Sequence, residues 1–165
     1  MNLVTSLAVV IGGLGALATW LFLGPLAGLH LQIWAAFIAW ASYFATGGTP
    51  ADLPKSLIAN LWGVGWATTA LISVGIFGHL GVPVIALIVG VTVCLMILGG
   101  QLPLLGAVPA LVFGYAPTAA FGLLTSAAGT DIHLGTGPAT TIAASMIVGA
   151  AFAYASGRLV GMLAK

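Results

Sequence analysis

Uncharged hydrogen-bonding side chains lie in the middle of an apolar segment that runs from about Leu57 to Phe77. This segment contains no ionisable residue, and its roughly 20 residues match the hydrocarbon thickness of a bilayer when they are helical. At helical spacing, one face is small and carries an amide, and another carries indoles and hydroxyls. The first face consists of Asn60, Gly63, Ala67 and Ala70, and the second of Trp62, Trp66, Thr69 and Ser73. Because polar groups at this depth need protein or water partners, we expect protein or a water path around this segment.

Two tryptophans are expected near the middle of the bilayer. Trp40 is about 9 Å deeper than Trp34, and Trp66 is about 16 Å from Lys55, at the rise of a helix. The aromatic belt at the membrane surface does not explain indoles at this depth. We therefore predict a narrow constriction at Trp40 and Trp66, and the alternative is ordinary core packing. The polar lining of this path is predicted to be Asn60, Tyr43 and Thr118.

Prolines interrupt the apolar segment from Pro103 to Leu124. Pro109 and Pro117 each remove a backbone donor, and the segment also contains Gly114, so we predict a broken helix here. Freed carbonyls at membrane depth are tolerated when they are buried or line a wet cavity, as in the broken helices of many transporters. The alternative is a structural kink whose carbonyls are satisfied by neighbouring helices.

Three histidines lie between apolar segments, at positions predicted to share the outer face of the membrane. They are His30, His79 and His133, and Asp131 lies beside the last. Imidazoles titrate near neutral pH, so these residues are candidates for pH sensing, although solvated loop residues are the simpler interpretation. Their spacing does not suggest a metal site, and we expect no cofactor.

The composition identifies a membrane protein. Of the 165 residues, 61% are hydrophobic and only 3% are charged, whereas soluble domains contain about 25% charged residues. The net charge of +1 gives no support for nucleic-acid binding. The whole chain contains two acidic residues, so it offers almost no candidate groups for hydrolytic catalysis, and we expect no enzyme.

Breaker residues divide the chain into six apolar segments that form one integral membrane domain over residues 1–165. The segments are Leu3–Leu23, Leu31–Thr46, Leu57–Phe77, Pro83–Leu98, Pro103–Leu124 and 138–157. We expect an all-α, multi-pass bundle of six transmembrane helices, the first an uncleaved span. Six crossings place Lys55, Arg158 and Lys165 on one side, which the positive-inside rule assigns, with both termini, to the cytoplasm.

Small residues recur at every fourth position in the last two segments. One ridge contains Gly106, Ala110, Gly114, Thr118, Gly122 and Ser126, and the other contains Ser145, Gly149, Ala153, Gly157 and Gly161. Such ridges let helix backbones approach closely. They pack either within one chain or between subunits, and we expect a homo-oligomer.

Two stretches carry a resemblance to a known family. WAAFIAWASYFATGG (34–48) and NLWGVGWA (60–67) resemble the YcdZ-like family of bacterial inner-membrane proteins, which is described only as a domain of unknown function. The resemblance implies a multi-span fold in the bacterial inner membrane and carries over no catalytic residue. The size is also similar to that of six-helix urea and amide channels. LPLLGAVP (102–109) resembles their LPxxTxP signature, but its second proline is one residue late and the threonine is absent.

The absence of charge from the middle of every apolar segment determines our functional hypothesis. Proton-coupled transporters usually keep acids or histidines within the membrane, although a charge at a helix centre costs about 2.5–3.5 kcal/mol. We therefore expect a channel or facilitator for a small uncharged polar solute, similar to urea or an amide. Sodium coupling through backbone carbonyls remains open. The competing hypothesis is a non-transporting structural or accessory subunit of the membrane.

Overall fold

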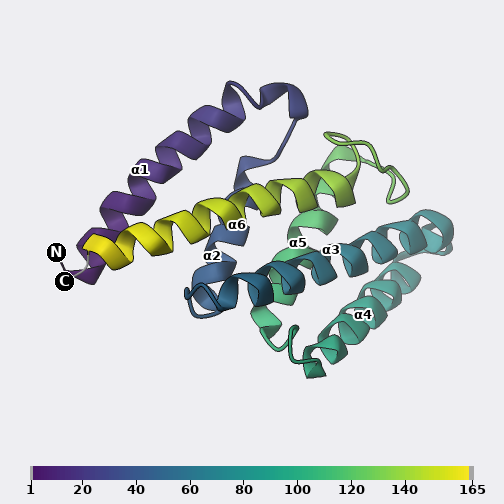
Figure 1. Ribbon diagram of the computed structural model, residues 1–165. Helices are drawn as coiled ribbons and strands as arrows, with labels where there is room; N and C mark the ends of the chain where they lie inside the picture. Colours follow the sequence, from purple (N-terminus) through teal and green to yellow (C-terminus); the bar gives the residue numbers. More distant parts are fainter. Residues whose placement is uncertain (1, 164–165) are drawn as a thin grey trace.

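A computed structural model describes residues 2–163 of the chain, and every regular element in that range is helical. The six α-helices run in alternating directions, and the start of α1 lies beside the end of α6 (Figure 1). Their bounds are α1 Leu3–Leu23, α2 Ile33–Ala45, α3 Asp52–Phe77, α4 Val82–Leu98, α5 Val108–Thr125 and α6 Pro138–Leu163. Short 3₁₀ turns follow α3 and α4, at Gly78–Leu80 and Gly99–Gln101, and a third, Ala27–Leu29, precedes α2. The prediction of an all-helical fold is confirmed.

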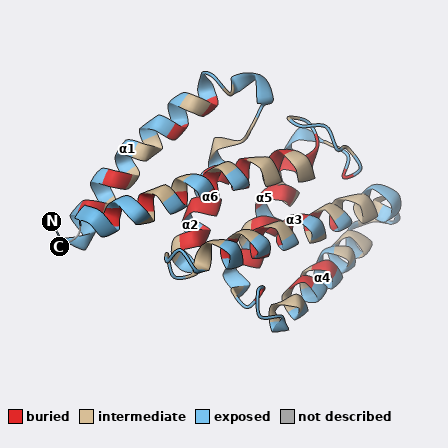
Figure 2. Ribbon diagram, in the orientation of Figure 1, coloured by how far each residue is buried: buried red, intermediate tan, exposed pale blue. Residues whose placement is uncertain are grey.

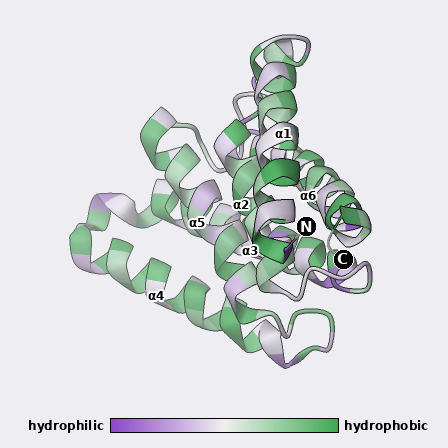
Figure 3. Cartoon of the chain, turned by 90° about the vertical axis from the view of Figure 1, so that its left-hand side faces the viewer, coloured by the Kyte–Doolittle hydropathy of each residue, from purple (hydrophilic) through white to green (hydrophobic). Residues whose placement is uncertain are grey.

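Five of the helices in the described range are long and apolar enough to cross a bilayer, all except α2. Hydrophobic residues cover most of the helix surfaces, whereas hydrophilic residues gather mainly at helix ends and turns (Figure 3). α1 and α3 begin, and α6 ends, on the same side of the bundle (Figure 1), and Lys55 lies near the start of α3 and Arg158 near the end of α6. The other residue used to predict the orientation, Lys165, lies outside the described residues.

The second helix is shorter than the apolar segment predicted. It has 13 residues, about 20 Å of helix, whereas the hydrocarbon core is about 30 Å thick. The chain ahead of it is extended, and α2 begins where the backbone N–H of Gln32 donates to Ser145 Oγ of α6 (2.9 Å). Hydropathy reports how apolar a segment is, not where its helix starts, so the start of α2 depends on this contact between helices.

Two pairs of helices form the centre of the bundle, α3 with α5 and α2 with α6. At the first crossing, a Cβ added to Gly114 would collide with the backbone of Asn60, and one added to Gly63 would collide with that of Leu111. At the second crossing, a Cβ on Gly149 would collide with the backbone of Ala36. The small-residue ridges of α5 and α6 therefore pack within the chain, onto α3 and α2 respectively.

The helices at the edge of the bundle are α1 and α4. α4 packs mainly on α3, and only 11% of its most apolar 18-residue stretch is buried within the chain. α1 packs mainly on α6. Buried residues are concentrated on α2, α5 and the facing sides of α3 and α6 (Figure 2). Much of the apolar surface of the edge helices therefore faces outward from this chain.

The prediction that Pro109 breaks the fifth helix is wrong. Pro109 lies in the first turn of α5, where a helix does not need the missing N–H. The helix continues through the buried Pro117, which cannot donate to the carbonyl of Phe113. Gly114 lies at the crossing with α3. The irregular backbone is instead the segment of residues 102–107 ahead of the helix.

Candidate polar site between the membrane helices

A buried polar cluster joins α2 to α3, and it consists of Ser42, Ser56 and Asn60. Ser42 Oγ donates to Asn60 Oδ1 (2.8 Å) and lies 2.9 Å from Ser56 Oγ. A hydroxyl has one proton, so if Ser42 donates to Asn60, Ser56 must donate to Ser42. The three side chains are at most 2% exposed. They form a one-directional chain of hydrogen bonds that ends on the amide oxygen of Asn60.

The side-chain nitrogen of Asn60 is the polar atom of this cluster that lacks a hydrogen bond in the described chain. Asn60 Nδ2 is buried and has no hydrogen-bond partner among the described residues. Exchanging the amide oxygen and nitrogen would leave the oxygen without a partner instead, because Ser42 reaches only one end of the group. A buried donor without an acceptor costs about 1–3 kcal/mol. Asn60 lies about 12 Å into α3 from Asp52, a depth at which the bilayer provides no replacement acceptor.

The turn between α2 and α3 brings these residues together. Gly47 and Gly48 have φ angles of +134° and +72°, which glycine adopts without the strain that a side chain would cause. Asp52 then accepts hydrogen bonds from the backbone N–H and the hydroxyl of Thr49 (3.2 and 2.6 Å), which fixes the start of α3. Ser56 and Asn60 lie one helical turn apart on the face of α3 that meets α2.

Trp40 lies in a different part of the core from this cluster. Its indole Nε1 donates to Ser156 Oγ of α6 (2.9 Å), and its ring stacks on Phe37 and Phe152 with centroids 5.6 and 5.7 Å away. Tyr43 is also buried, and its hydroxyl lies against Gly157 of α6. Trp40 and Tyr43, two of the three aromatic residues predicted for the path, therefore pack at the α2–α6 contact.

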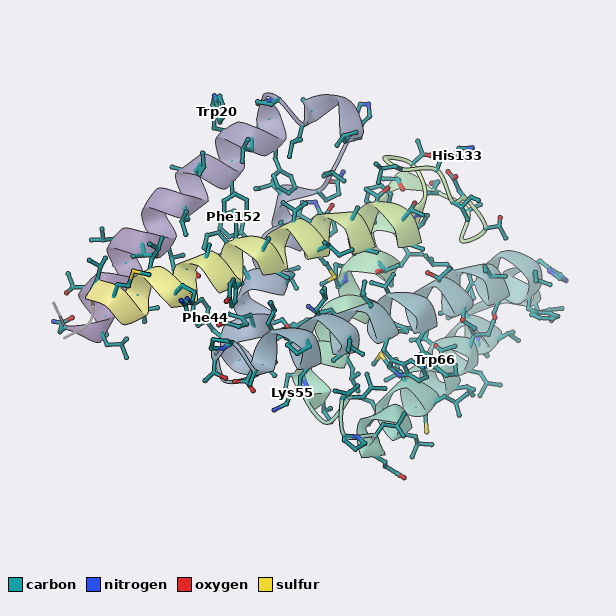
Figure 4. The ribbon with its side chains drawn as sticks, in the orientation of Figure 1. Trp20, Phe44, Lys55, Trp66, His133 and Phe152 are labelled. Atoms are coloured by element: carbon teal, nitrogen blue, oxygen red, sulfur yellow. The ribbon has the colours of Figure 1, made fainter. Side chains whose placement is uncertain are left out.

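Trp66 lies on the opposite side of the bundle, on α3 beside α4 (Figure 4). It is half-buried, and it packs edge-to-face on Trp62 with ring centroids 6.0 Å apart. The cores against which Trp40 and Trp66 pack share no residue. Within one chain, the structure does not bring these two indoles together.

Thr118 is also buried, and its hydroxyl donates to the carbonyl of Gly114 within α5 (2.9 Å). A second polar pair joins α4 to α5, where the hydroxyls of Thr92 and Tyr115 are 2.9 Å apart. Our sequence reasoning missed this pair and also missed Ser42 and Ser56. The spacing of Ser56 and Asn60 was the available signal, but Ser56 follows Lys55 and was placed outside the apolar segment.

In the described chain, no hydrogen bond joins any of the three histidines to another. His30 lies against Gly135, two residues from His133, whereas His79 contacts the carbonyl of Ile76 in its own turn (3.0 Å). His133 binds Asp131 through its backbone N–H and ring Nδ1 (2.9 and 2.8 Å). These bonds, with one from Thr136, hold the pKa of Asp131 below its usual value.

A cavity of about 380 Å³ lies beside the loop that contains the histidines. It is lined by His30, Gln32, Trp34, Phe121, Leu124, Thr125 and Gly135. Its walls come from the start of α2, the end of α5 and the loop ahead of α6, so it is a hollow at the end of the bundle opposite Lys55.

These observations define an α-helical, multi-pass membrane protein whose buried polar groups are uncharged. Residues 8–161 match a family described as "Protein of unknown function (DUF1097)", and the chain belongs to this family. Searches of curated proteins and of solved structures gave no match. The resemblance to an uncharacterised membrane family is thus confirmed, and the similarity to urea channels gains no support from these comparisons.

Proposed function

We propose that this protein is a facilitator of the bacterial inner (plasma) membrane for small uncharged polar solutes such as urea and short amides. The observation that carries the proposal is the amide of Asn60, which is buried at membrane depth and has N–H donors without an acceptor among the described residues. A solute carbonyl would complete this hydrogen-bond set, and the hydroxyls of Ser42 and Ser56 would exchange partners as the solute passed.

The distribution of charge supports a neutral solute. Asp52 and Lys55 lie in the first turn of α3, Asp131 lies in a loop, and Arg158 is close to the end of α6. None of these groups lies near the middle of a helix, where it could compensate the charge of an ion. The polar cluster offers only hydroxyl and amide groups, which suit a neutral solute with both donors and acceptors.

The path has to open for transport, because the three polar side chains are sealed from solvent in the described conformation. The contact between α2 and α3 is the natural place, since these helices pack on each other much less than each packs on its main partner. On this proposal, the conformation described above is an occluded state. Opening would separate Ser42 from Asn60 and would give the amide to the solute.

The proposal is tested by stopped-flow measurements of solute entry into proteoliposomes, with urea, acetamide and glycerol as separate solutes. We expect faster entry than in protein-free vesicles, and we expect Asn60→Leu to abolish the increase while preserving the Ser42–Ser56 bond. Thr19→Val is the matched control, because it changes an exposed hydroxyl that bonds only within its own helix and belongs to neither the cluster nor the groove at Trp66. Entry rates equal to those of protein-free vesicles for all three solutes would refute the proposal.

The second candidate is a non-transporting structural or accessory subunit of the membrane. The pairing of polar groups across helix interfaces favours it, since Trp40 binds Ser156, Thr92 binds Tyr115 and Trp62 binds the carbonyl of Met96. In that case these bonds hold the bundle together and no solute passes. The same vesicle assay separates the two candidates, because a structural subunit leaves every entry rate at the protein-free value.

A further inference from the structure

The indole of Trp66 has an unused hydrogen-bond donor at the middle of the membrane. Among the five tryptophans, three donate to acceptors within the described chain. These are Trp34, Trp40 and Trp62. Trp20 has no acceptor there, but it lies near the outer end of α1 and points away from the bundle, where headgroups and water are within reach (Figure 4). Trp66 also has no acceptor among the described residues, and it has no such access.

The depth of Trp66 excludes the usual partners of an exposed indole. With its 3₁₀ extension, the third span runs over the 29 residues Asp52–Leu80, so Trp66 is its central residue, with 14 residues on either side. Each end is about 21 Å away along the helix. Lipid carbonyls, headgroups and water lie at the surfaces of a hydrocarbon core that is about 30 Å thick. An acceptor for this N–H must therefore come from another protein chain or from a molecule dissolved in the membrane.

The surface around Trp66 is a groove that contains both a donor and an acceptor. It has a volume of about 380 Å³ and is lined by Leu61, Trp62, Gly65, Trp66 and Thr69. The hydroxyl of Thr69 uses its proton on the carbonyl of Gly65 (3.0 Å) and accepts no hydrogen bond in the described chain. A Cβ added to Gly65 would meet nothing within 4 Å, so the floor of the groove is open.

We propose that this groove is the contact surface for a second copy of the same chain. A two-fold interface brings the same patch of both subunits together, so it requires a patch that is complementary to itself. This groove meets the requirement, because it offers one free donor, on Trp66, and one free acceptor, on Thr69. Two copies related by a two-fold axis beside Gly65 supply two donors and two acceptors, and each Trp66 N–H reaches the partner's Thr69. The open floor at Gly65 allows the two α3 helices to approach closely.

This interface does not depend on the proposed transport function. The polar cluster of Ser42, Ser56 and Asn60 lies on the buried side of α3, whereas Gly65 and Thr69 lie on the exposed side. The interface also gives further protein neighbours to the indole and hydroxyl face of α3, which α4 covers only in part.

Cross-linking tests the location of the interface. In a background in which the exposed Cys94, the only cysteine, is replaced by alanine, single cysteines are introduced as Gly65→Cys, Gly12→Cys and Gly90→Cys. The last two are matched controls on α1 and α4, because a Cβ at each of these three glycines meets nothing within 4 Å. After oxidation in lipid vesicles, we expect disulfide-linked dimers with Gly65→Cys and not with the controls. Equal cross-linking at the three positions would overturn the proposal.

Energy transfer between labelled copies, measured while the protein is diluted in lipid, tests the role of the indole donor. Trp66→Phe keeps an aromatic ring and removes the N–H. Since two hydrogen bonds are lost per dimer, we expect the dimer dissociation constant to rise about tenfold, whereas Trp20→Phe leaves it unchanged. A dimer as tight in Trp66→Phe as in the parent overturns the proposal. A protein that stays monomeric at every dilution also overturns the proposal.

Discussion

Replacing Gly114 by alanine should loosen the contact between α3 and α5, the most extensive helix pair of the described chain. The added methyl group would occupy the space of the Asn60 backbone, which cannot turn away as a side chain can. To relieve the collision, the helices must separate by roughly 1 Å or more, which weakens dispersion contacts along the whole crossing. Overpacking of this kind costs about 1–3 kcal/mol, and a rigid backbone neighbour favours the upper part of that range.

Alanine also gains helix propensity over glycine, by about 0.5–1 kcal/mol at most. We therefore expect Gly114→Ala to lower the free energy of unfolding by about 1–2 kcal/mol. The measurement is reversible unfolding of the protein in mixed micelles with increasing sodium dodecyl sulfate, followed by tryptophan fluorescence and circular dichroism. The loss of tertiary contacts, and not of helix content, should move to a lower denaturant fraction.

Gly12→Ala is the matched control for this experiment, because Gly12 is also within a helix and a Cβ there meets nothing within 4 Å. It should leave the stability unchanged or raise it by up to about 1 kcal/mol. If the two substitutions changed stability by the same amount, the close approach of α3 and α5 at Gly114 would not be a determinant of the fold. The reasoning from backbone contact would then be refuted.

Three further substitutions test individual polar groups. Ser42→Ala leaves Asn60 without its donor and should lower the unfolding free energy by about 1–3 kcal/mol in the same titration; a neutral effect would mean that water enters the cluster. Trp40→Phe keeps the ring stack but removes the bond to Ser156, and should cost about 0.5–1.5 kcal/mol without a change in helix content; a larger loss would point to packing rather than to the hydrogen bond. The pKa of Asp131 is lowered in the folded chain, so its stabilisation should be complete above the usual carboxyl pKa of about 3.9 and be lost as the pH falls through the lower folded value. Asp131→Asn should reduce this acid-range dependence of unfolding by the part that Asp131 contributes, and an unchanged pH profile in the variant would assign it to another group.

The composition and the breaker residues predicted most of the helical architecture. The bounds of the first helix agree with the prediction, Leu3–Leu23, because Gly24 and Pro25 end an uninterrupted apolar run. Agreement fails where a neighbouring helix determines the local structure. The start of α2 depends on a hydrogen bond from Gln32 to Ser145, a residue far away in the sequence, and no local signal reports it.

The candidate site was predicted in part. Asn60 was singled out because an amide inside an apolar helix requires a partner, and this requirement can be read from the sequence alone. The rest of the cluster could not be identified in that way, because Ser42 belongs to another helix and Ser56 lies outside the predicted apolar segment. The sequence also did not show that Trp40 and Trp66 lie apart. Residue number predicts depth in the membrane, whereas the direction that a side chain faces depends on how the helices pack.

By itself, the sequence determined that this chain lies in a membrane, that it is helical, and that its buried polar groups are uncharged. These properties follow from local composition, since the hydrocarbon core of a bilayer satisfies no backbone or side-chain hydrogen bond. Only the tertiary structure decided which polar groups meet: it joined Asn60 to Ser42 and Ser42 to Ser56, and it left the Trp66 donor without an acceptor in the described chain. The physical reason is that the central helices approach most closely where glycine allows backbone contact, as at Gly63, Gly114 and Gly149, and these crossings determine which faces of those helices meet.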